Sequence, residues 1–154
     1  MATETERIKK LLRNNWDGPM WYGGNLQETL KGISWEKAFY KPANFSHNIY
    51  EYVMHLVTWR KFVTEHLNGN TDYKTEINSE LDWITQYEKG EVTWLKALAE
   101  LEASQTALLA AAENITEEML DELVPGKKFK WYVMLHGVIQ HDIYHSAQIA
   151  LLKK

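Results

Sequence analysis

The sequence contains no cysteine. Disulfide bonds, thiolate nucleophiles and cysteine-ligated zinc or iron–sulfur centres are therefore excluded. Any metal ion that the protein binds must be held by histidine and carboxylate ligands. The sequence also lacks a run of about 18 apolar residues, so it predicts no membrane-spanning helix. Its first segment, MATETERIKKLLRNNW, is charged rather than apolar, and we expect a cytoplasmic protein.

An excess of positive charge is also missing. The formal net charge is −4 and the sequence pI is about 5.9, which argues against a nucleic-acid-binding protein. The chain has 154 residues, of which 45% are hydrophobic and 25% charged. These values are typical of a soluble globular protein, and we expect one domain that spans residues 1–154.

Helix-breaking residues are scarce, because the chain has only three prolines and eight glycines. Alternation of apolar and polar residues, the pattern of a strand, is nearly absent. A first amphipathic helix is predicted over about residues 5–15 and ends at the loop WDGPMWYGGN. Short helical segments are predicted over 26–33 and 34–39.

Three further long helices are predicted. The second long helix follows Ser46, a candidate N-cap, and ends before Gly69. An aperiodic connection then covers residues 70–90, with one helical turn expected near 80–87. The third and fourth long helices are predicted over 91–114 and 131–152, separated by a turn capped by Thr116 and the loop VPGKKFK. These elements predict an all-α fold, a four-helix bundle with a long connection between its second and third helices.

The last helix carries three of the six histidines, in HGVIQHDIYHSAQIALLKK. His141 and His145 are separated by one turn and lie about 40° apart on a face shared with Met134 and Val138. That face must point to the interior because its apolar members need burial. Two imidazoles at this spacing can share one metal ion. His136 points about 140° away from His141 and cannot join them.

A third ligand has to come from the second long helix, which carries His47, His55 and His66. His47 and His66 lie about 12 and 16 Å along the axis from His55, so only one of the three can meet the C-terminal pair. His55 is the central one and shares its face with aromatic and polar residues suited to a pocket. We therefore favour His55.

Other interpretations of these residues exist. The pair can be two hydrogen-bonded core histidines with no metal. HDIYH has the histidine spacing of a zinc-protease helix, but Asp142 stands where that motif needs a glutamate base. A di-iron carboxylate site needs Glu-x-x-His pairs, whereas Glu51 precedes His55 by four residues. The sequence disfavours the last two interpretations.

The two histidine-bearing segments resemble a known family. FSHNIYEYVMHLVTWRKFVTEHLNG and HGVIQHDIYHSAQIALLKK are similar to the second and fourth helices of the DinB/YfiT-like four-helix-bundle proteins, in which an ending of the form HDxYHxGQI is common. The likeness extends over essentially the whole chain. It implies a divalent zinc, nickel, iron or manganese ion held by His55, His141 and His145. Ala147 stands where many relatives have glycine.

The resemblance also implies an activity. Some relatives are transferases or isomerases that use low-molecular-weight thiols such as bacillithiol or mycothiol, and most have no assigned reaction. We expect a metal-dependent enzyme, a thiol-dependent S-transferase or related hydrolase, acting on an electrophilic small molecule. The alternative is a non-catalytic stress-related or interaction protein whose metal only stabilises the bundle.

Residues around the three histidines can be given roles. Three neutral imidazoles leave open coordination positions, as in catalytic sites. Glu51 or Asp142 is expected to orient a ligand imidazole through its second nitrogen. The candidate pocket walls are Trp59, Phe62 and Tyr144.

The fourth long helix is apolar on a second side. Its members Ile139, Ile143, Ala147 and Ala150 lie roughly opposite His141. A helix that is apolar on both faces needs a second partner. We expect a two-fold homodimer through this face, a habit that the family resemblance also implies.

Overall fold

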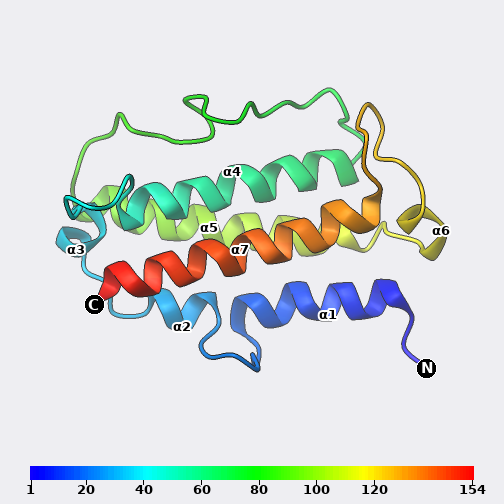
Figure 1. Cartoon of the computed structure of the whole chain (residues 1–154), viewed down its shortest axis with the longest axis horizontal. Helices are drawn as coiled ribbons and strands as arrows, with labels where there is room; N and C mark the ends of the chain where they lie inside the picture. The colour runs from blue at the N-terminus through cyan, green and yellow to red at the C-terminus, as the bar shows by residue number, and fades with distance from the viewer.

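The computed structural model describes all residues 1–154, and the chain is all-α, with seven helices and no strand (Figure 1). No helix has the length and apolar character needed to cross a membrane. Four helices are long and three are short. The long helices are α1 (Glu4–Asp17), α4 (Ile49–Leu67), α5 (Glu91–Ala112) and α7 (Trp131–Lys153), and the short ones are α2 (Leu26–Leu30), α3 (Trp35–Phe39) and α6 (Glu117–Leu120).

The start of α4 differs from the sequence-based prediction. Its N-cap is Asn48 rather than Ser46. Asn48 Oδ1 accepts a hydrogen bond from the backbone N–H of Glu51 at 2.9 Å, and the Glu51 carboxylate accepts one from the Asn48 backbone. This reciprocal capping box satisfies two N–H groups that a serine two residues earlier cannot reach. Gly69 has φ +87°, a left-handed conformation that turns the chain after the helix.

Residues 68–90 contain no helix and run along the outer side of α4 (Figure 1). The helical turn expected near 80–87 is confined to its start: Trp83 and Asp82 donate their backbone N–H groups to Ser79 O at 3.0 and 3.1 Å, and residues 84–89 are irregular. The segment is held by side chains instead, because Thr58 donates to Leu81 O at 2.9 Å. This attachment brings Asp82 and Trp83 onto the surface of α4.

The buried apolar residues form two separate clusters. Along α4 the division falls between Leu56 and Phe62, and along α7 it falls between Ile139 and Ile149. Arg60 of α4 and the buried polar residues of α7, which are Asp142, His145 and Ser146, lie in this gap, and His55 borders it. The two hydrophobic clusters therefore enclose a polar layer between α4 and α7.

Helix α7 contacts α4 on one side and α1 and α2 on the other (Figure 1). Ile139, expected at a dimer interface, is only 5% exposed and belongs to the core of its own chain. Ile143 is half-buried, whereas Ala147 and Ala150 are exposed. The face of α7 opposite His141 is therefore covered in part by α1 of the same chain.

Candidate metal centre

Three histidines from two helices meet in the polar layer. His55 of α4 and His141 and His145 of α7 each offer a ring nitrogen, and these nitrogens lie within 4.8 Å of one another. The ring centroids are separated by 4.5–4.8 Å. This is the trio that helix spacing and the family resemblance predict.

The other three histidines are engaged elsewhere. His66 donates from Nδ1 to Phe62 O of its own helix, at 2.8 Å. His136 lies 3.5 Å from the Glu4 carboxylate, and His47 contacts the Glu51 carboxylate at 3.0 Å. The structure therefore separates the six histidines into one group of three and three isolated residues.

Hydrogen bonds at Nδ1 orient two of the grouped imidazoles. His55 Nδ1 lies 2.8 Å from Asp82 O, and His145 Nδ1 lies 2.5 Å from Gln148 Oε1. Both oxygens can only accept, so each Nδ1 carries the proton and donates it. In a neutral ring the proton on Nδ1 leaves the lone pair on Nε2, the atom a metal ion needs.

The third imidazole is left incompletely satisfied. His141 Nε2 lies 2.9 Å from His55 Nε2, which can only accept in this tautomer. Without a cation His141 must donate from Nε2, and its Nδ1 then carries a lone pair. That buried Nδ1 has no hydrogen-bond partner, and neither does Asp142 Oδ1, which is 4.0 Å away. In that tautomer His141 Nδ1 and Asp142 Oδ1 are both acceptors, and neither can donate to the other.

A cation shared by the three Nε2 atoms removes this conflict. His141 then carries its proton on Nδ1, where it points to the unpartnered Asp142 oxygen. The residues present therefore fit a divalent metal: three neutral nitrogen donors, each with an acceptor beside the opposite ring nitrogen.

Asp142 is held by a buried ion pair. Its Oδ2 accepts hydrogen bonds from Arg60 Nε at 2.9 Å and Nη2 at 2.7 Å. Asn15 Nδ2 approaches the same oxygen at 3.4 Å, and the Trp16 ring covers the guanidinium at 5.3 Å. Arg60 and Asp142 are 0% and 2% exposed. Burial raises the pKa of Asp142 above its ordinary value, and Arg60 opposes that rise.

Burial also sets the protonation state of the three imidazoles. It lowers the pKa of His141 to about 3, helped by the proximity of His145 and His55. It lowers the pKa of His145 to about 4, against a hydrogen bond to Gln148 that raises it. The pKa of His55 is lowered by burial as well. At neutral pH all three rings are neutral, which is the form that binds metal.

A family model of the DinB superfamily matches residues 23–149. This range covers most of the chain and includes all of α4, α7 as far as Ile149, and the three histidines. The chain belongs to the DinB superfamily. No curated protein and no solved structure gives a significant match.

The most informative residue that sequence reasoning missed in this DinB-superfamily chain is Asp82. Its backbone oxygen orients His55, and its Oδ1 lies 3.0 Å from the same ring and accepts from Trp59 Nε1 at 2.8 Å. Trp83 stacks on His55, with 3.9 Å between ring centroids and 8° between planes. Both residues lie in the aperiodic connection, where no periodic pattern indicates which residues meet α4.

Of the two carboxylates expected to orient an imidazole, only Asp142 faces one of the three. Glu51 accepts a hydrogen bond from the Tyr87 hydroxyl at 2.6 Å, and its other oxygen contacts His47. Burial and this contact with Glu51 raise the pKa of Tyr87. The Glu51 carboxylate is therefore engaged at the beginning of α4, away from the three grouped rings.

Of the three residues expected to form pocket walls, two line a cavity and one does not. Trp59 and Phe62 line a cavity beside His141, whereas the Tyr144 side chain is 63% exposed. The Tyr144 ring does contact His145, with centroids 5.0 Å apart. It covers the outside of that imidazole rather than an enclosed space.

Proposed function

We propose that this chain is a divalent-metal-dependent enzyme of the DinB superfamily, with one ion held by Nε2 of His55, His141 and His145. The observation that carries the proposal is the pair of unpartnered atoms, His141 Nδ1 and Asp142 Oδ1. Their position is accounted for when Nε2 of His141 binds a cation. The proposal includes a four-helix bundle of DinB/YfiT type, in which α4 and α7 hold the ion between them.

The donor set favours certain metals and a catalytic role. Imidazole nitrogens suit zinc, nickel and iron better than manganese, which prefers oxygen ligands. Three neutral protein ligands leave positions open for an exchangeable molecule. A divalent ion bound there would lower the pKa of a coordinated thiol or water molecule, so that the thiolate or hydroxide forms near neutral pH.

The residues around the three imidazoles have defined tasks in this proposal. Asp82 and Gln148 keep the protons of His55 and His145 on Nδ1, so that Nε2 stays available. Asp142 Oδ1, 4.0 Å from His141 Nδ1, stabilises the tautomer with the proton on Nδ1, and Arg60 keeps that carboxylate in place. Trp83 covers one face of His55 and shields it from water.

The proposed reaction is S-transfer from a low-molecular-weight thiol to an electrophilic small molecule. The thiol loses its proton to solvent, and its sulfur forms a bond to the electrophilic carbon. The bond from that carbon to the leaving group breaks, and the leaving group departs with the electron pair. The chain has no cysteine of its own, so the sulfur must come from a separate thiol. Hydrolysis replaces the thiol with water at the same position.

The test compares metal-loaded and chelator-stripped protein, purified without a His tag. We expect about one ion per chain and turnover of 1-chloro-2,4-dinitrobenzene with a low-molecular-weight thiol only in the loaded form. His145→Ala removes both signals, and His136→Ala, on the same helix, keeps both. An ion bound stoichiometrically without turnover of a panel of thiols and electrophiles supports the alternative, a metal that only stabilises the fold. Absence of the ion overturns both.

We also propose a homodimer through the outer side of α7. Its support is an exposed stripe that includes Tyr144 and Leu151, which are 63% and 60% exposed, with the small residues Ala147 and Ala150 beside it. Small side chains allow close approach of a second helix.

A further inference from the structure

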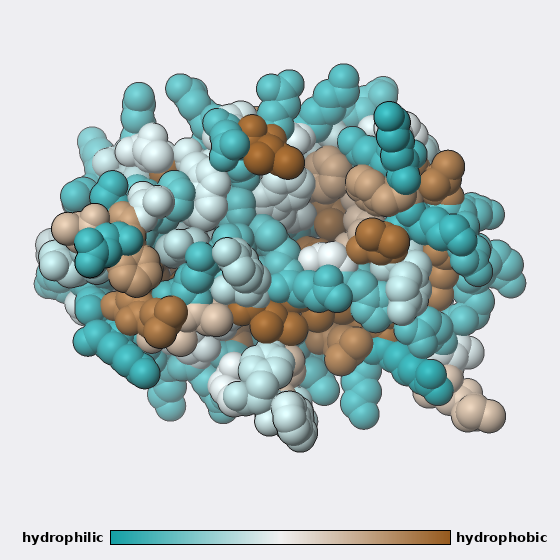
Figure 2. Space-filling model, in the orientation of Figure 1, coloured by the Kyte–Doolittle hydropathy of each residue, from teal (hydrophilic) through white to brown (hydrophobic).

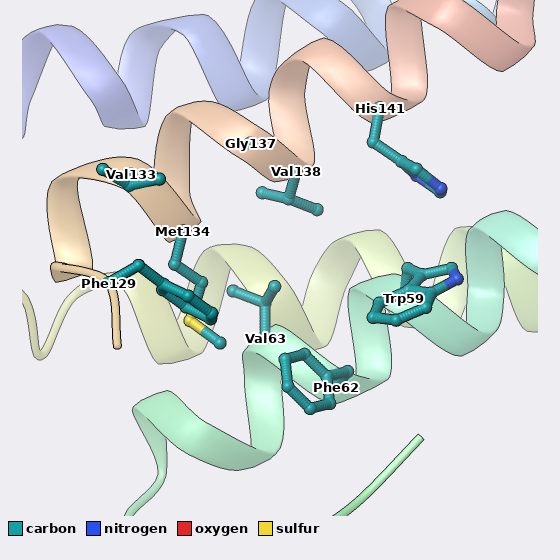
Figure 3. Close-up of a pocket in the computed structure, with 9 residues that line it drawn as sticks. All are labelled: Trp59, Phe62, Val63, Phe129, Val133, Met134, Gly137, Val138 and His141. Atoms are coloured by element: carbon teal, nitrogen blue, oxygen red, sulfur yellow. The ribbon is translucent and has the colours of Figure 1, made fainter. Parts of the chain in front are cut away.

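An open cavity of about 230 Å³ lies between α4 and α7, and His141, one of the three grouped histidines, lines it (Figure 3). Seven of its nine lining residues are hydrophobic, and none carries a formal charge at neutral pH. The lining residues are Trp59, Phe62, Val63, Phe129, Val133, Met134, Gly137, Val138 and His141. Figure 2 shows brown, apolar residues around a hollow right of centre on the face that α4 and α7 share.

The cavity extends away from the three histidines along α7. His141 and Trp59 form one end of it, and Phe129, from the segment before α7, lies at the other (Figure 3). The Trp59 and His141 rings meet edge to face with centroids 6.1 Å apart. Trp59 is held there by its hydrogen bond to Asp82, the residue that also orients His55. A molecule whose reacting group sits at the three histidines can therefore extend along the cavity.

Gly137 lies within α7 and lines this cavity. Glycine destabilises the interior of a helix relative to alanine, so its presence there needs a reason. Packing supplies none, because a Cβ built at Gly137 meets no atom within 4 Å. The backbone at Gly137 is in ordinary helical conformation, so a left-handed φ angle does not explain the glycine either. What the missing side chain does provide is open space on the α7 wall of the cavity.

We infer that this cavity binds the apolar part of the substrate, an aryl or short branched alkyl group, and that Gly137 sets the width available to it. The inference rests on the proposed function and names the substrate class of that site. A dry cavity of about 150 Å³ lined by Leu, Ile and Phe holds benzene, so about 230 Å³ admits an aromatic ring with a short chain. A charged or sugar-like group would lose part of its hydration against these walls and find almost no polar partner on them.

The first experiment examines the cavity without metal. Chelator-stripped protein with labelled methyl groups is titrated with ethylbenzene and followed by NMR. We expect saturable shifts of the Val63, Val133 and Val138 methyl signals, and none at Val92, which is exposed on α5. Uniform small shifts over the whole protein, or no shifts, overturn the inference.

The second experiment fills the cavity. Gly137→Leu places a side chain into it and should weaken ethylbenzene binding at least tenfold. Ala99→Leu adds the same side chain to an exposed position of α5 and should leave binding unchanged. Gly137→Ala is the second variant, for use if leucine prevents folding. It should raise the thermal midpoint of unfolding and still weaken the binding of ethylbenzene. Unchanged binding in both Gly137 variants overturns the role of this glycine.

The third experiment links the cavity to the histidines. The affinity of zinc-loaded protein for phenylacetohydroxamate is compared with that for acetohydroxamate. Burial of the ring should improve affinity at least tenfold, and Gly137→Leu should remove that gain. Equal affinities overturn the inference while leaving the metal proposal intact. If zinc does not bind but ethylbenzene does, the proposed function fails and the preference of the cavity for apolar groups stands.

Discussion

His141 Nδ1 lies 4.0 Å from Asp142 Oδ1, and neither buried atom has a hydrogen-bond partner. Consecutive residues of a helix point in different directions, so this approach depends on the rest of the layer. Arg60 holds the other oxygen of Asp142 with two hydrogen bonds, and His55 faces the opposite nitrogen of His141. The two atoms attract each other when His141 carries its proton on Nδ1. His141 Nε2 then has a lone pair that faces the lone pair of His55 Nε2, and a cation between them is needed.

Replacement of the three grouped histidines should remove the metal. We expect His55→Ala, His141→Ala and His145→Ala each to lower the metal content per chain to near zero at neutral pH, because two imidazoles hold a divalent ion far less tightly than three. His136→Ala is the control, since it lies on α7 but away from the group. Full metal content in His55→Ala would remove the link between α4 and α7.

Loss of the Gln148 side chain should weaken metal binding without unfolding the protein. Gln148 is partly exposed and orients His145 through one hydrogen bond. Removing such a partner lowers metal affinity about 10- to 100-fold in other proteins, and we expect Gln148→Ala to do the same. Gln140→Ala is the matched control, because Gln140 is exposed on the same helix. Equal zinc dissociation constants for the two variants would show that Gln148 has no orienting role.

Breaking the buried ion pair should be costly. Arg60→Ala leaves the Asp142 carboxylate buried without its charged partner, so the free energy of unfolding should fall by about 3–5 kcal/mol. The double variant Arg60→Met/Asp142→Leu should recover much of this loss, because no unpaired charge remains. Urea denaturation of metal-free protein measures both. Arg13→Ala, which breaks an exposed contact with Glu113, should leave the free energy of unfolding almost unchanged.

The metal-free protein should lose stability in mild acid. Burial lowers the pKa of His141 to about 3 and of His145 to about 4, whereas both titrate near about 6.5 in the unfolded chain. Between these values the unfolded chain binds more protons, so the free energy of unfolding falls as the pH falls below about 6.5. The slope should approach about 1.4 kcal/mol per pH unit for each extra proton.

Urea midpoints between pH 7 and pH 5 measure this slope, and His141→Gln should reduce it. A midpoint that stays constant over this range would contradict the prediction. For the loaded protein, acidification toward pH 5 should release the ion, because protons compete for the same nitrogens.

The proposed dimer should depend on the outer side of α7. We expect light scattering at micromolar concentration to give twice the chain mass, and Leu151→Glu to give a monomer, because a charge would be buried against the partner helix. Val92→Glu changes an exposed apolar residue of α5 in the same way and should leave the mass unchanged. A monomer for the unmodified protein would exclude this interface.

Local patterns determined much of this protein. Scarce glycine and proline with helical periodicity predicted an all-α chain, and the structure confirms it. The family model confirms the DinB assignment made from the two histidine-bearing segments. Spacing along the last helix paired His141 with His145 and favoured His55 as their partner, because helical geometry relates residue number to direction and height, and these three rings lie together.

Only the tertiary structure decided what surrounds those three rings. Asp82 reaches His55 because the connection over residues 68–90 lies along α4, and an aperiodic segment carries no signal for its path. Arg60 meets Asp142 because α4 and α7 pack against each other. Gly137 becomes a cavity wall for the same reason. These contacts join residues far apart in the sequence, so they depend on the packing of helices and not on the periodicity of any one of them.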